Sequence, residues 1–127
     1  MALGVLSMDR ARHTPDERSA LRPVEFHILL SLAGSERHGY GIIQDIEARG
    51  ETSVPDVGTM YRALARLVED RLIAPTARRP SPDAGDERRH YYRITEAGLR
   101  AARAEARRLE ALTRAARTGG LLVKDTK

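Results

Sequence analysis

Two arginines four residues apart carry the clearest candidate chemistry in the sequence. Arg62 and Arg66 lie in the segment 57–70, and stepping about 100° per residue around a helix places both opposite the large apolar side chains. A guanidinium group is a planar fork of hydrogen-bond donors that matches a phosphate or the O6/N7 edge of guanine. The inward arc holds Val57, Met60, Leu64, Leu67 and Val68, and the outward arc holds Gly58, Thr59, Arg62, Ala65, Arg66 and Glu69, with Tyr61 on the flank.

Charge is distributed unevenly along the chain, whose formal net charge is +4. Residues 1–56 carry 6 basic and 9 acidic side chains, whereas residues 57–127 carry 16 basic and 9 acidic ones. A GC-rich genome would also favour arginine over lysine, so the asymmetry is more informative than the residue type. The basic half indicates an anionic partner such as nucleic acid.

Composition limits the fold and the compartment. The 127 residues fit one domain, but Leu, Ile, Val and Phe make up only 27 of them, so the core is thin and oligomerisation is a natural remedy. The absence of cysteine excludes disulfides and thiolate zinc sites. No apolar run approaches the ~20 residues of a membrane span, and the first eight residues lack a basic signal-peptide region. We therefore expect a soluble, cytoplasmic protein.

Three helices are predicted before the middle of the chain. The first spans about 22–33, with Pro23 at its start, and the second spans 38–49. Gly39 and Gly41 are poor helix formers, so their place at the start of the second helix indicates a close backbone approach. The third helix spans 57–70 and is expected to be capped by Asp56.

A β-hairpin and a long helix follow. Strands are predicted at 72–78 and 88–94 around a Gly- and Pro-containing turn, with Pro75 confining its strand to an edge. Thr95 is expected to cap a helix over 96–117, which ends at Gly119-Gly120. Its narrow apolar stripe is typical of a helix that meets a partner helix, and comprises Leu99, Ala102, Ala106, Leu109, Leu112 and Ala116.

This order of elements predicts a mainly α fold with a small β-hairpin: a winged helix-turn-helix with a C-terminal dimerisation helix. The DNA-binding domain would span residues 21–95 and the dimerisation helix residues 96–117. Residues 1–20 are expected to form a flexible tail and residues 118–127 a loose end. A helix with this outward face fits the DNA major groove, and a basic wing can contact phosphates or the minor groove.

The sequence resembles the PadR family of bacterial transcriptional regulators over about residues 21–100, in its compact subgroup with a single short C-terminal helix. The resemblance rests on FHILL at 26–30, HGYGI at 38–42, GTMYRALARL at 58–67, Leu72-Ile73 and RRHYYRITEAG at 88–98. It implies a homodimeric DNA-binding repressor whose C-terminal helix pairs with the first and C-terminal helices of the other subunit. The dimerisation residues are then Phe26, Leu99, Ala102, Ala106, Leu109 and Leu112.

The resemblance also implies where DNA is contacted. Contacts are expected from the start of the second helix, from the outward face of the third and from the wing, at Tyr40, Thr59, Tyr61, Arg62, Arg66, Arg88 and Arg89. Tyr61 could pack its ring on the hairpin while its hydroxyl reaches a phosphate. Arg71 stands where the family usually has glycine, which calls a left-handed helix cap into question. The absence of tryptophan argues against the aromatic drug-binding pore of some relatives.

Other functions are weighed against this one. A winged-helix module that binds protein would present an apolar or acidic recognition face, whereas this one presents Arg62 and Arg66. The four histidines are scattered, and Glu96 and Glu105 are expected to be solvated, so neither a metal sensor nor an enzyme is favoured and no cofactor is expected. The predicted function is a dimeric repressor at a near-palindromic promoter site, released by a small-molecule effector that the sequence does not identify.

Overall fold

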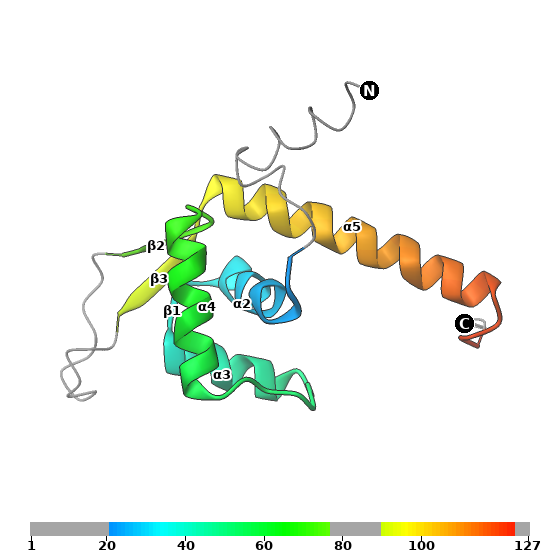
Figure 1. Cartoon of the computed structure of the whole chain (residues 1–127), viewed down its shortest axis with the longest axis horizontal. Helices are drawn as coiled ribbons and strands as arrows, with labels where there is room; N and C mark the ends of the chain where they lie inside the picture. The colour runs from blue at the N-terminus through cyan, green and yellow to red at the C-terminus, as the bar shows by residue number, and fades with distance from the viewer. Residues whose placement is uncertain (1–20, 77–89, 124–127) are drawn as a thin grey trace, which may run out of the picture.

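The computed structural model describes residues 21–76 and 90–123 and has the predicted fold class (Figure 1). The tail at 1–20, the predicted turn at 79–87, Arg88, Arg89 and residues 124–127 lie outside the described residues. The elements are α2 (Pro23–Gly34), β1 (Arg37–His38), α3 (Gly39–Ala48), α4 (Val57–Glu69), β2 (Ile73–Pro75), β3 (Tyr91–Ile94) and α5 (Glu96–Thr118).

The predicted helix boundaries agree with the structure within one or two residues, because their capping residues act as expected. Asp56 accepts a hydrogen bond from the Thr59 backbone amide at 2.7 Å, and Thr95 accepts one from the Gly98 amide at 3.0 Å. At the other end of α5, Gly120 has φ +84° and the Leu121 amide donates to the Ala116 carbonyl. This hydrogen bond closes a Schellman turn after the helix.

The sheet has three strands rather than the two of a hairpin, because Arg37 and His38 form a strand, β1, that was not predicted. The strand order is β1-β3-β2, all antiparallel, and β1 pairs with β3 through His38 opposite Tyr91. His38 ends β1 and caps α3, because its Nδ1 accepts the Gly41 amide at 3.0 Å. Pro75 lies in β2, an edge strand as predicted.

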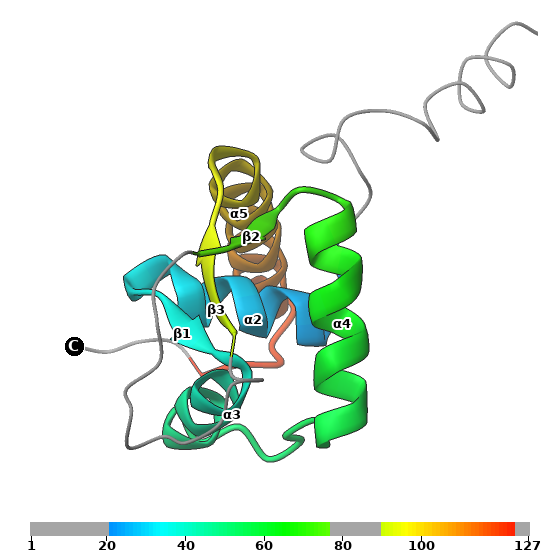
Figure 2. The same cartoon turned by 90° about the vertical axis from the view of Figure 1, so that its left-hand side faces the viewer.

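Helix α2 lies at the centre of the core and contacts α3, α4, α5 and β3 (Figure 2). The core is made of large aliphatic side chains that are almost fully buried: Ile28, Leu29, Ile42, Ile46, Met60, Leu64, Leu67, Leu72 and Ile73. The expected inward position of Val57 was wrong, since this side chain is 57% exposed. Val57 is the first residue of α4 and lies outside the buried face of the helix. Ala63, which was not assigned to that face, is buried.

A tight junction joins the end of α4 to the start of α5. Arg71 has φ 63°, the Leu72 amide donates to the Leu67 carbonyl, and the Arg71 amide donates to the Val68 carbonyl. The left-handed cap is therefore present although arginine replaces glycine, at a conformational cost of about 1–2 kcal/mol. Thr95 then donates two hydrogen bonds to this junction. Its hydroxyl donates to the Arg71 carbonyl at 2.7 Å, and its amide donates to the Leu72 carbonyl at 3.1 Å.

The C-terminal half of α5 extends beyond the other described elements (Figure 1). Within the described ranges, none of the helices combines the length and apolar character needed to cross a bilayer.

Glu105 of α5 is buried, so its expected solvation was wrong. It accepts hydrogen bonds from Arg108 at 3.0 and 2.6 Å and one from the Leu21 backbone. The Arg108 hydrogen bonds lower the pKa of the Glu105 carboxyl below its ordinary value. The stabilisation from this ion pair is therefore present at neutral pH and is lost as the pH falls through the lowered pKa.

Candidate nucleic-acid interface

Arg62 is exposed on the first turns of α4, where a neighbouring side chain orients it. Its Nη2 donates to the Thr59 hydroxyl at 3.3 Å, and its Nη1 lies beside Gly58. The Thr59 amide and hydroxyl lower the pKa of the Asp56 carboxyl, and the nearby positive charge of Arg62 acts in the same direction. Asp56 therefore stays ionised at neutral pH and caps α4, beside the exposed Arg62.

Arg66 has a different environment, although the sequence groups it with Arg62. Its Nε lies 3.4 Å from Oε2 of Glu25, a residue of α2 that is only 1% exposed. The other carboxylate oxygen of Glu25 accepts the Arg22 amide at 2.9 Å. Arg66 is half-buried and joins α4 to α2, so removing its charge would take a cationic partner from a buried carboxylate.

Tyr61 packs over the first residue of α3. A Cβ built on Gly39 would lie 2.6 Å from the Tyr61 hydroxyl oxygen, which confirms the close backbone approach predicted at this glycine. Burial raises the pKa of Tyr92 on β3, and the neighbouring Tyr61 raises it further, so the two phenols lie close together. The Tyr61 ring therefore lies beside the start of α3, and part of the residue stays exposed. Tyr40 follows Gly39 on α3 and is also exposed.

The structure describes only the base of the wing. β2 and β3 pair from Ile73–Ile94 to Pro75–Tyr92, and the predicted contacts Arg88 and Arg89 lie outside the described residues. Across the described part of the chain, no three His, Asp or Glu side chains gather where they could hold a metal ion.

The predicted dimerisation residues fall into two groups. Phe26 and Ala102 pack against the core of their own chain, and Leu99 is partly buried. Ala106, Leu109 and Leu112 are exposed on the projecting part of α5, where Leu112 is 53% exposed. Further exposed apolar side chains that the sequence reasoning did not assign to an interface are Leu30 on α2 and Leu121, Leu122 and Val123 after α5.

Comparisons with known proteins agree with this geometry. Residues 28–104, more than half of the chain, match the model of the transcriptional regulator PadR-like family. The fold resembles a transcriptional regulator from Clostridium thermocellum, with 27% identity and a TM-score of 0.63 over 80% of this chain and 90% of that one. It also resembles a PadR-like transcriptional regulator from Bacillus cereus, with 25% identity and a TM-score of 0.64 over 80% and 93% of the two chains.

A PadR family transcription regulator from Clostridium difficile shares the fold, with 23% identity and a TM-score of 0.62 over 75% of this chain and 95% of that one. No protein with a curated description matches this chain in sequence. The family match covers α3, α4, the sheet and the start of α5, which are the elements that position Tyr40, Tyr61 and Arg62. The chain therefore belongs to the PadR-like family of transcriptional regulators.

Proposed function

We propose that this regulator is a homodimeric, cytoplasmic repressor that occupies a near-palindromic promoter site and leaves it when a small-molecule effector binds. The observation that carries the DNA-binding part is the exposed guanidinium of Arg62, which the Thr59 hydroxyl orients on the first turns of α4. Helix α4 would enter the major groove with this end, and Arg62 would bond the O6/N7 edge of a guanine.

The remaining contacts would fix the protein on the phosphate backbone. Tyr40 lies near the start of α3 and Tyr61 beside it, both residues are exposed, and their hydroxyls would donate to phosphates. Arg66 forms an ion pair with Glu25, so we assign it a phosphate contact at the edge of the groove rather than a base contact. Arg88 and Arg89 would add wing contacts.

Dimerisation would place two such DNA-binding domains, here called heads, on one face of the duplex. The exposed stripe of Ala106, Leu109 and Leu112 on the projecting part of α5 offers a seam to the same stripe of a second copy, with Phe26 and Leu99 at its inner end. Two recognition helices about 34 Å apart would then read half-sites in successive major grooves.

Arg62→Ala tests the recognition face. We expect it to cost about 1–3 kcal/mol of binding to the cognate site, which is about 5- to 150-fold in Kd, and to relax the preference for one base pair. The site would first be selected from genomic fragments, and binding would then be measured by fluorescence anisotropy. Arg114→Ala is the matched control, because Arg114 is an exposed arginine of α5. Unchanged affinity and base preference in Arg62→Ala would show that this face does not read DNA.

The salt dependence of binding separates DNA from a protein partner. If several phosphates are neutralised, log K falls steeply and linearly with log salt concentration. Binding that stays constant between low and moderate salt would favour the protein-binding module.

Gly39→Ala tests the placement of Tyr61. The new Cβ would displace the Tyr61 hydroxyl, so we expect the loss of about one hydrogen bond to DNA, or about fivefold in Kd. Gly41→Ala is the control, because a Cβ there would lie at an ordinary 3.4 Å from the His38 ring. Equal DNA affinity for both variants would exclude a contact from Tyr61.

A further inference from the structure

A pocket of about 260 Å³ lies between the start of α2 and the loop that joins α3 to α4. Its apolar walls are Pro23 and Val24 of α2 and Val54 and Pro55 of the loop. Thr59, the residue that orients Arg62, also lines it. The pocket, here called the α2–α4 pocket, is of a size for a compact organic molecule with an apolar body.

The polar end of the α2–α4 pocket is formed by His27 and Glu51, whose Nε2 and Oε1 atoms lie 3.3 Å apart. On the other side of the imidazole ring, Nη2 of Arg49 lies 3.2 Å from Nδ1 of His27. Because a guanidinium group can only donate, Nδ1 accepts and the ring proton belongs on Nε2, which donates to Glu51. The acidic residue among the residues that line the pocket is Glu51.

We propose that the α2–α4 pocket binds a small organic ammonium ion with a compact apolar body, and that this class of molecule is the effector. The effector role rests on the proposed function, whereas the binding of an ammonium ion does not. The carboxylate of Glu51 and the hydroxyls of Ser53 and Thr59 accept the ammonium hydrogens, and the proline and valine walls cover the apolar body. A carboxylate ligand is disfavoured because it would face Glu51.

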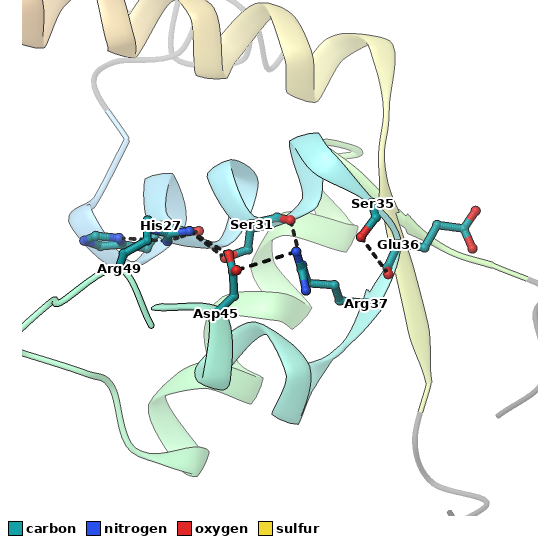
Figure 3. A network of polar contacts seen from close by, with 7 residues as sticks. All are labelled: His27, Ser31, Ser35, Glu36, Arg37, Asp45 and Arg49. Carbon is teal, nitrogen blue, oxygen red and sulfur yellow. Dashed lines mark hydrogen bonds and ion pairs between the residues drawn. The ribbon is translucent and has the colours of Figure 1, made fainter. Parts of the chain in front are cut away.

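The pocket is connected to both helices of the helix-turn-helix. Figure 3 shows Arg49 in contact with His27 and Ser31 of α2 and with Asp45 of α3. Nη1 of Arg49 lies 2.7 Å from Oδ2 of Asp45. Asp45 in turn lies 3.5 Å from Nη2 of Arg37 on β1. On the other wall, an ammonium held by the Thr59 hydroxyl competes with Arg62 for the same oxygen. An occupied pocket therefore withdraws support from the side chain that reads DNA, and DNA affinity falls.

Binding is tested first, without DNA, by ¹H–¹⁵N NMR titration of the full chain with benzylamine. We expect chemical shift changes that saturate at millimolar benzylamine and are centred on the amides of Val24, Ser53 and Thr59. Benzyl alcohol and benzoate should cause much smaller changes. Glu51→Gln should weaken benzylamine binding about tenfold, whereas Glu47→Gln, an exposed acid of α3 outside the pocket, should not. Diffuse shifts, or equal binding of the three probes, would overturn the site.

Regulation is tested next, by measuring the Kd for the selected DNA site with saturating benzylamine. We expect a rise of at least fivefold in the wild-type protein and in Glu47→Gln, and a clearly smaller rise in Glu51→Gln at the same amine concentration, because this variant is only partly occupied. Saturated binding with an unchanged DNA Kd would overturn the effector role. A chain that binds benzylamine but no genomic fragment at any salt concentration would instead refute the proposed function.

Discussion

Gly98→Ala is expected to lower the free energy of unfolding by about 3 kcal/mol, the largest effect on stability among the substitutions considered. A Cβ on Gly98 would lie 2.0 Å from the Leu72 carbonyl oxygen and 2.8 Å from a side-chain carbon of Ile94. The clash with the Leu72 carbonyl cannot be relieved by a change of rotamer, because this group belongs to the backbone. The carbonyl also accepts a hydrogen bond from the Thr95 amide, which holds it in place. The first turn of α5 would have to move away from the end of α4.

Urea unfolding at one fixed protein concentration measures this effect, because the stability of the proposed dimer would depend on concentration. Gly34→Ala is the control, since nothing lies within 4 Å of a Cβ at that helix end. We expect its midpoint to change little. If Gly98→Ala unfolds at the same urea concentration as Gly34→Ala, the two helices are not held together at this glycine.

Leu109→Asp is expected to separate the subunits and to weaken DNA binding by about 10²–10⁴-fold, because binding to two half-sites becomes binding to one. Leu109 lies at the middle of the exposed stripe of α5, and a carboxylate placed among the apolar side chains of the proposed seam would lose its hydration. Analytical ultracentrifugation gives the oligomeric state, and circular dichroism shows that the helices are retained.

Ala111→Asp is the matched control, because Ala111 is exposed and lies on the side of α5 away from Leu109. It adds the same charge to the same helix, so any general effect of aspartate on helix stability is shared by both variants. A folded dimer from Leu109→Asp would place the interface on another surface.

Local signals explain most of what the sequence predicted. The 3.6-residue period separates the two faces of α4, and Asp56 and Thr95 cap their helices through hydrogen bonds that span only three residues. The short strand β1 was not predicted because two residues cannot show an alternating pattern, and its pairing with β3 joins Arg37 to Tyr92 across a long stretch of sequence.

Properties that depend on distant residues could not be predicted. The different environments of Arg62 and Arg66 follow from Glu25, which is buried one helix away and far from both in sequence. The burial of Glu105 follows in the same way from the Leu21 backbone and the packing of α5 on α2. Helical periodicity reports the direction of a side chain but not the partner that it meets.

In the proposed dimer, the hydrogen bonds from Thr95 to the Arg71 and Leu72 carbonyls would have a mechanical consequence. They would couple the end of α4 to the start of α5, whose 23 residues form an arm of about 35 Å. Rotating that arm by about 10° at the far end would displace the head by about 6 Å, nearly two base-pair steps of B-DNA. A slight change of crossing angle between two copies would thus suffice to put both heads out of phase with their grooves.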